Sequence, residues 1–141
     1  MKKILLFIWQ LPQNLVALFI LFILNRKNER YSKKIENCTV WFVKRGVFKA
    51  GISLGNFIIL NNLFDTSKVS SKYLSKTVKH EHGHQIQSMY TGPLYVLIIG
   101  IPSLCVNIYD RIYKKGSNWY YNQYPEKQAD SLGDVHRWND L

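Results

Sequence analysis

The sequence opens with a long apolar stretch that is followed by a short polar one. Residues 4–24 contain few polar side chains and are long enough to cross a bilayer as a helix with a kink. Residues 26–37 are polar and charged, as expected for a juxtamembrane linker. The pattern therefore predicts a transmembrane anchor over residues 1–25, the linker, and a folded domain over residues 38–141.

Two segments have the β-branched and aromatic composition that is typical of strands. Residues 39–43 come first, residues 44–46 give a turn signal, and residues 47–60 are rich in Ile and Phe. We expect a small antiparallel β-hairpin or meander here, in which Gly51 and Gly55 mark bulges or close backbone approach. The second segment is either an ordinary core strand or an edge strand able to pair with an extended peptide.

A helix is predicted to follow these strands and to end near residue 90. Asp65-Thr66-Ser67 or Ser70-Ser71 supplies residues that favour the N-cap position, and Gly92-Pro93 stops the helix. A last helix opens at Pro125, because proline is favoured at the first helical position. The chain is therefore expected to belong to the α+β class.

A second apolar stretch separates these two helices. Residues 93–109 are apolar but are interrupted by Gly100-Ile101-Pro102. Such a break predicts two short helical arms, a broken hairpin that dips into or lies against a membrane and returns. This re-entrant segment requires its irregular backbone to be covered by protein.

The predicted central helix carries a pattern that is typical of metal sites, His80-Glu81-x-x-His84. Residues four positions apart lie on the same face of a helix, so His80 and His84 can bind one ion together. Glu81 lies beside them and can reach a water molecule on that ion without being a ligand. His82 points away from the pair by about 200° and is not expected to bind the same ion.

Two histidines do not complete a catalytic zinc site, which has three protein ligands and an open position. We choose Glu126 as the third ligand, because Glu126-Lys127-Gln128-Ala129-Asp130 places a carboxylate on a helix with a second acid one turn later. Asp130 can then accept the free ring N–H of His80 or His84 and fix its orientation. Glu126 is also an ordinary residue for the first turn of a helix.

Composition narrows the range of functions. A chain of 141 residues has room for one domain. Its net charge of +10 could indicate nucleic acid, but the basic residues are scattered and no nucleic-acid-binding motif is present. A membrane surface explains the charge better. Cys38 and Cys105 are far apart in the sequence and predict two free buried thiols rather than a disulfide framework.

The two metal-site motifs together carry a family resemblance. His80-Glu81-x-x-His84 followed by Glu126-x-x-Ala129-Asp130 resembles the gluzincin branch of zincin metallopeptidases, which includes small membrane-bound bacterial zinc peptidases. The resemblance implies a minimal zincin with one Zn²⁺ per chain. It implies that His80, His84 and Glu126 bind the zinc, that Glu81 is the general base, and that Asp130 supports the ligands. Polypeptides that are membrane-associated or unfolded would be the substrates.

The choice of Glu126 constrains the topology. If residues 93–109 crossed the bilayer, Glu126 would emerge opposite His84, unless the site lay within the membrane. The alternative is a full span with Asp110 as third ligand, as in intramembrane zinc peptidases. Lys76 and Lys79 on the central helix argue against burial in lipid. The excess of Lys and Arg after the first apolar stretch predicts an inner-membrane protein whose domain faces the cytoplasm.

Two questions stay open at the level of sequence. Peptide hydrolysis needs a donor for the developing oxyanion, and the candidates are His136, Arg137, Tyr120, Tyr121 and Tyr124. A different class of function is a non-catalytic, membrane-anchored zinc-binding or interaction module. A fourth protein ligand would complete the coordination of its zinc. The candidates for this ligand are His82, His136, Asp130 and Asp134. The oligomeric state is not predicted.

Overall fold

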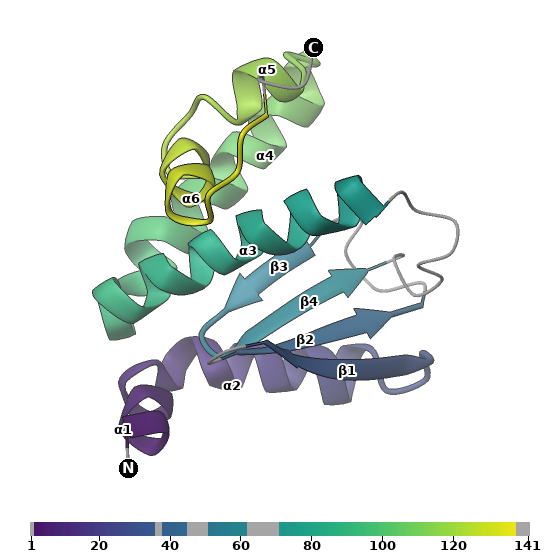
Figure 1. Cartoon of the computed structure of the whole chain (residues 1–141), viewed down its shortest axis with the longest axis vertical. Coiled ribbons are helices and arrows are strands. Elements are labelled where there is room, and N and C mark those ends of the chain that lie inside the picture. The colour runs from purple at the N-terminus through teal and green to yellow at the C-terminus, as the bar shows by residue number, and fades with distance from the viewer. Residues whose placement is uncertain (1, 36–37, 45–50, 62–70, 138–141) are drawn as a thin grey trace.

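The computed structural model describes residues 2–35, 38–44, 51–61 and 71–137. Within these residues the chain forms an α+β domain, in which helices cover both faces of a four-stranded sheet (Figure 1). The α+β class predicted from the sequence is confirmed. The strands are β1 (Arg30–Ile35), β2 (Cys38–Val43), β3 (Gly51–Leu54) and β4 (Phe57–Asn61).

The sheet is mixed and has the spatial order β1-β2-β4-β3. β1 pairs with β2 and β3 pairs with β4 in antiparallel fashion, but β2 and β4 are parallel. The prediction of a purely antiparallel hairpin or meander is therefore wrong for the central pair. The reason is that the β3–β4 hairpin, which turns at Gly55 with a φ of 60°, brings β4 next to β2. Helices bury both faces of this central pair, as is usual for parallel strands.

The segment predicted as a linker contains the first strand. β1 lies within residues 26–37, and its four central residues are exposed, with only the two end residues partly covered. It is an edge strand that pairs on one side, with Tyr31 opposite Phe42 and their rings stacked 4.7 Å apart. A strand that is exposed on both faces has no apolar alternation, so its sequence looks like a polar linker.

The core consists of two clusters, one on each face of the sheet. Alternate residues of β2 and β4 point to opposite faces, as the pleat of a strand requires. Val40 and Ile58 belong to the cluster that Val78 of α3 (Ser71–Thr91) covers. Val43 and Ile59 belong to the other cluster, which α2 (Leu11–Phe19) and the following π-helical turn η1 (Ile20–Leu24) cover. Figure 1 shows the sheet between α2 and α3.

The N-terminal apolar segment is part of this domain. Ala17, Ile20 and Leu21 are fully or almost fully buried in the core. α1 (Lys2–Trp9) precedes α2, and the two helical parts meet at an angle of 79°. The bend matches the predicted kink, but the segment does not stand apart from the domain as an anchor on a linker. Its crossing of a membrane stays a prediction.

The central helix ends where the sequence predicts. α3 stops at Thr91, and the short 3₁₀ helix η3 (Gly92–Leu94) follows with Gly92 at a φ of 54°. Gly92 packs against the indole of Trp9, and a Cβ on this residue would lie 2.2 Å from that ring. The capping residues predicted at positions 65–67 and 70 lie outside the described residues.

The second apolar stretch forms one helix and not two arms. The π-helical segment η4 (Val96–Gly100) continues directly into α4 (Ile101–Tyr113), so the predicted break at Gly100-Ile101-Pro102 is wrong. Proline at position 102 removes the N–H that an α-helix would donate to the carbonyl of Ile98. The hydroxyl of Tyr124 donates to that carbonyl instead, at 3.0 Å, and so allows the helix to continue.

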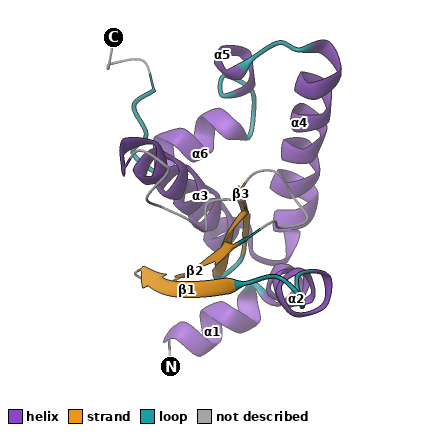
Figure 2. Ribbon diagram, turned by 90° about the vertical axis from the view of Figure 1, so that its right-hand side faces the viewer, coloured by secondary structure: helices purple, strands orange, loops and turns teal. Residues whose placement is uncertain are grey.

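The chain reverses after α4 and returns beside it. Lys114 and Gly116 have φ angles of 51° and 87°, and they lead into the short helix α5 (Ser117–Tyr120). α6 (Glu126–Leu132) then packs against α3 (Figure 2). This return brings Glu126 to the central helix although residues 93–109 do not turn back themselves.

Two apolar stretches meet the length and composition of a membrane span. Among the described residues, Val96–Tyr113 forms one helix of 18 residues that is long and apolar enough to cross a bilayer. Lys2–Trp9 and Leu11–Leu24 pass the same test only when they are taken together as a bent pair. The sequence favours the N-terminal stretch as the span, whereas in the structure the second stretch forms the straighter helix.

Candidate metal centre

The metal-site motif lies on the inner face of α3. His80, Glu81 and His84 are each only 6% exposed, although the helix itself is largely polar. The rings of the two histidines are one helical turn apart, with centroids separated by 4.8 Å. Two imidazoles and a carboxylate are thus buried together, which is a costly arrangement unless they bind one another or an ion.

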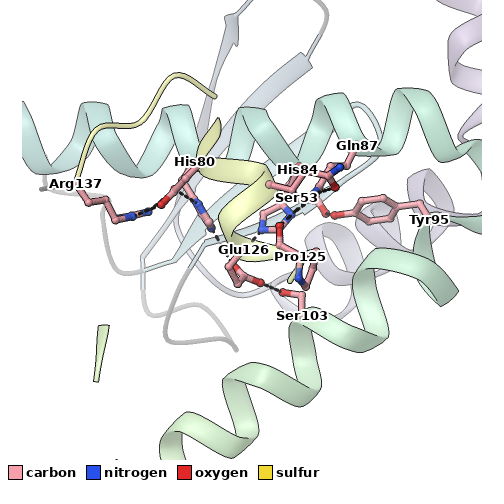
Figure 3. Close-up of polar contacts among 11 residues, drawn as sticks. Ser53, His80, His84, Gln87, Tyr95, Ser103, Pro125, Glu126 and Arg137 are labelled. Atoms are coloured by element: carbon pink, nitrogen blue, oxygen red, sulfur yellow. Dashed lines mark hydrogen bonds and ion pairs between the residues drawn. The ribbon is translucent and has the colours of Figure 1, made fainter. Parts of the chain in front are cut away.

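Glu126 completes the group from α6. Its Oε2 atom lies 3.1 Å from Nε2 of His80 and 3.3 Å from Nε2 of His84. A tetrahedral zinc ion with ligands at about 2.0–2.1 Å requires ligand atoms about 3.3 Å apart. The three ligand atoms all lie within 4.8 Å of one another (Figure 3). The buried His80-His84-Glu126 group could therefore hold a metal ion, and the sequence choice of Glu126 agrees with this geometry.

Both histidines are oriented by their second ring nitrogen. Nδ1 of His80 lies 2.7 Å from Oδ1 of Asp130, and Nδ1 of His84 lies 2.7 Å from Oε1 of Gln87. These contacts leave both Nε2 atoms directed at Glu126, as metal-binding imidazoles require. Asp130 contacts His80 as the sequence predicts. Gln87 is not predicted, although its position three residues after His84 on the same helix would have indicated the contact.

The oriented histidines are tied in turn to α6 and to the C-terminal segment. Gln87 donates to the carbonyl of Pro125 at 3.1 Å and to the side chain of Gln128 at 2.8 Å. Asp130 accepts two hydrogen bonds from Arg137, from Nε at 2.5 Å and from the terminal nitrogen at 2.8 Å. Arg137 also lies over the ring of Tyr121, 3.2 Å from its centroid. Arg137 therefore supports Asp130 and does not point at the metal ligands.

The remaining oxygen of Glu126 is held by α4. Ser103 donates to Oε1 at 2.5 Å, so the carboxylate presents Oε2 to the histidines (Figure 3). Burial alone would raise the pKa of Glu126, but the hydrogen bonds with His80 and His84 outweigh it and hold the pKa well below its ordinary value. Glu126 is therefore ionised and ready to bind a cation. The contact of Ser103 was not predicted from the sequence, because Ser103 and Glu126 lie on different helices and no spacing rule relates them.

We expect Ser103→Ala to weaken zinc binding about 10- to 100-fold, the usual effect of losing a partner of a metal ligand. The reason is that Glu126 loses the contact that fixes which oxygen faces the histidines. Competition with a chromophoric chelator measures the affinity. Ser131→Ala removes an exposed hydroxyl from α6 and is the matched control. Equal affinities of the two variants would show that Ser103 does not position Glu126.

The backbones of α3 and α6 approach very closely at this site. A Cβ on Gly83 would lie 1.9 Å from the carbonyl oxygen of Ala129. A Cβ on Gly133 would lie 2.0 Å from the carbonyl oxygen of Lys79. Only glycine fits at either position, so these two residues set the distance at which Glu126 faces the histidines.

The carboxylate of Glu81 lies between α3 and the edge strand β3. A Cβ on Gly51 would lie 2.5 Å from Oε1 of Glu81, so glycine leaves room for this side chain. The sequence prediction of close backbone approach at Gly51 is confirmed. Burial raises the pKa of Glu81, while the nearby histidines oppose the shift. The edge strand lies beside the metal group, and the carbonyl of its Ser53 accepts a hydrogen bond from Tyr95 at 2.9 Å.

The charges of the site favour a cation. Burial alone would lower the pKa of His80, but its hydrogen bonds to Asp130 and Glu126 outweigh this effect and raise the pKa to about 9. The carboxylates therefore attract positive charge to the position of the imidazole nitrogens. A divalent cation bound by the same atoms would satisfy this attraction, and the donor set of two imidazoles and one carboxylate suits zinc.

Several candidates from the sequence lie away from the group. Tyr124 contacts Ile98 instead of the ligands. His136 is exposed and pairs with Asp134 at 3.0 Å. Asp110, the alternative third ligand, accepts a hydrogen bond from the backbone of Gly116 at the far end of α4 and is not one of the residues that form the metal group.

Tyr120 lies near Glu126. Burial raises the pKa of the Tyr120 hydroxyl, and the negative charge of Glu126 raises it further. The ring of Tyr121 instead meets the ring of His80 edge-on, with centroids 5.2 Å apart. His82 is not one of the residues that form the metal group.

Comparison of the chain with protein-family models, curated proteins and solved structures finds no match. The geometry of the site therefore carries the functional argument.

Proposed function

We propose that the protein is a zinc-dependent endopeptidase that acts on polypeptides at a membrane. One observation carries the proposal: three residues with the ligand types of a catalytic zinc site converge in a buried position, and the carboxylate of Glu81 lies beside them. Bound zinc would supply Lewis acidity, which acidifies water and polarises a carbonyl oxygen. The proposal agrees with the gluzincin resemblance of the two motifs.

Glu81 acts as the general base in this proposal. It takes a proton from the attacking water as the water oxygen bonds to the peptide carbon, and it delivers that proton to the amine nitrogen as the C–N bond breaks. Its adjacency to His80 on α3 and its enclosure by Gly51 of β3 hold the carboxylate near the reacting atoms. We assign the oxyanion donor to Tyr120, because its hydroxyl lies near the ligand Glu126, whose charge raises the pKa of that hydroxyl.

The edge strand supports a peptide substrate. β3 lies at the end of the sheet and packs against α3, so an extended peptide could add to it next to Glu81. The carbonyl of Ser53 already accepts a hydrogen bond from the hydroxyl of Tyr95. We therefore assign substrate pairing to the part of β3 at Gly51 and Ile52.

Catalysis is favoured over a purely structural zinc site by the number of ligands. A structural site is closed by a fourth protein ligand, whereas a catalytic site keeps one position for water. Among the described residues, three form the metal group. Three of the four candidates for a fourth are otherwise engaged, because Asp130 binds His80 and Arg137, and Asp134 and His136 pair at the surface. The remaining candidate, His82, is not part of the metal group.

Removal and return of the metal test the proposal. We expect about one zinc per purified chain, loss of cleavage of an unstructured fluorogenic polypeptide after chelation, and recovery when zinc is added. His84→Ala should lose both the metal and the cleavage. His136→Ala, which removes an exposed histidine, should retain both. A correctly folded protein that binds no zinc would contradict the proposal.

A further inference from the structure

The N-terminal helix has its polar and apolar sides reversed relative to a helix in water. Gln10, Gln13 and Asn14 are fully buried, whereas Leu15 and Phe19 are 56% and 52% exposed. A helix on the surface of a water-soluble protein shows the opposite arrangement. The exposed side of this helix therefore has the polarity of a surface that meets an apolar medium.

Two of the three buried amides, Gln13 and Asn14, have specific partners inside the protein, whereas the side-chain amide of Gln10 has none among the described residues. Gln13 donates to the hydroxyl of Ser88 at 3.0 Å and to the carbonyl of Gly92 at 2.8 Å. Asn14 accepts from the backbone N–H of Asn56 at 2.8 Å. These contacts fix the rotation of α2, so its apolar side cannot turn inward without breaking them. The exposure of that side is thus set by the fold.

α4 repeats this arrangement on the same side of the molecule. Ser103 points inward to Glu126, while Ile101, Leu104 and Ile108 are 48%, 57% and 48% exposed. In Figure 2, α4 runs along the right-hand side and α2 is seen end-on at the foot of that side. The outward side chains of the two helices form what we call the outer apolar face, comprising Leu15, Phe19, Phe22, Ile101, Leu104 and Ile108.

Basic residues lie at the margins of the outer apolar face. Arg26 and Lys27 follow the end of η1, and Lys114 and Lys115 follow the end of α4, all of them exposed. Tyr113, 60% exposed, lies next to the latter pair. An apolar surface bordered by cations and aromatic rings matches the boundary between the acyl chains and the headgroups of an anionic bilayer. A second copy of the chain fits less well, because it would bring cationic margins together.

We propose that the outer apolar face docks into one leaflet of an anionic lipid bilayer, with α2 and α4 lying in the plane of the membrane. The metal group is then separated from the lipid by the thickness of α4, since Ser103 contacts Glu126 from its inner side. This position defines the substrates as polypeptides held at the same leaflet, and that assignment rests on the proposed function. Docking itself does not depend on hydrolysis.

Cys105 provides a probe for depth in the bilayer. It lies near the middle of the Val96–Tyr113 helix and is exposed, so the prediction of two buried thiols is wrong for Cys105 and right for Cys38. An environment-sensitive fluorophore can therefore be attached to Cys105 in the full-length Glu81→Gln protein, in which zinc is bound but hydrolysis is removed. The labelled protein is reconstituted with phosphatidylcholine–phosphatidylglycerol vesicles that carry quenchers either near the headgroups or at the centre of the bilayer.

We expect the protein to float with the vesicles and the fluorophore to be quenched more strongly by the shallow quenchers. Stronger quenching by the central quenchers would overturn the proposal, because it would show that α4 spans the bilayer. A protein that stays off the vesicles as a dimer would overturn it too, since a second copy would then cover the face. Neither outcome would change zinc content, which tests the proposed function separately.

Substitution in the outer apolar face gives a second readout. Combined Phe19→Asp and Leu104→Asp should lower vesicle binding about tenfold or more. Both side chains are about half exposed, so the fold and the zinc content should be retained. Leu132→Asp, on α6, is the control and should bind vesicles as the unmodified protein does. Unchanged binding of the double variant would contradict the proposed face.

Discussion

Glu81→Gln is expected to bind zinc with unchanged affinity and to cleave an unstructured polypeptide about 10²- to 10⁴-fold more slowly. Glutamine keeps the size of the side chain, so it still fits beside Gly51, where a Cβ would be only 2.5 Å from the Glu81 carboxylate. It cannot take the proton from water. The group that could hold the ion is His80, His84 and Glu126 and does not include Glu81, so the ion should stay in place.

Two measurements separate this effect from damage to the fold. Metal analysis and thermal unfolding should agree between Glu81→Gln and the unmodified protein, while kcat falls and KM changes little. Glu29→Gln removes a carboxylate that is 65% exposed on its side chain, and it should leave all four quantities unchanged. Cleavage at the normal rate by Glu81→Gln would remove Glu81 from the mechanism.

The pairing of His80 with His84 in the group that could hold a metal ion could be predicted from the sequence because helical geometry is local. A spacing of four residues places His80 and His84 on one face of any helix, and the structure shows their nitrogens facing the same oxygen of Glu126. The choice of Glu126 does not follow from the helix that carries the histidines. Its choice depended on a second acid one turn later, Asp130, and the contact of that acid with His80 agrees with the choice.

The contacts that the sequence did not indicate join elements that are distant along the chain. Ser103 reaches Glu126 from α4, and Tyr124 replaces the hydrogen bond that Pro102 removes. Neither contact follows from spacing, so the sequence predicted that Gly100-Ile101-Pro102 would divide the helix, with a full span as the alternative. The parallel pairing of β2 with β4 likewise depends on which strand of a hairpin lies inside the sheet, which strand composition does not specify.

The N-terminal segment shows how composition alone can mislead about organisation. Its length and polarity predict a separate anchor, but Gln13 and Asn14 bind partners in α3 and in the β3–β4 turn. In the sequence pattern these polar residues interrupt a predicted span. In the structure they are the residues that attach the helix to the domain.

Gly83→Ala is expected to abolish zinc binding at micromolar zinc and to lower the free energy of unfolding by about 1–3 kcal/mol or more. The added Cβ would lie 1.9 Å from the carbonyl oxygen of Ala129, which is backbone and cannot rotate away. α3 and α6 must therefore separate. Because the two helices carry the histidines and Glu126, their separation opens the 3.1 Å and 3.3 Å spacings on which the metal site depends.

Glycine elsewhere in the chain provides the control for this steric argument. A Cβ on Gly100 would lie 3.9 Å from its nearest neighbour, which is ordinary contact, so Gly100→Ala should keep both zinc and stability. Gly133→Ala, whose Cβ would lie 2.0 Å from the carbonyl of Lys79, should behave like Gly83→Ala. Isothermal titration with zinc and chemical unfolding measure the two effects. If Gly83→Ala bound zinc as tightly as Gly100→Ala, the distance between α3 and α6 would not control the metal site.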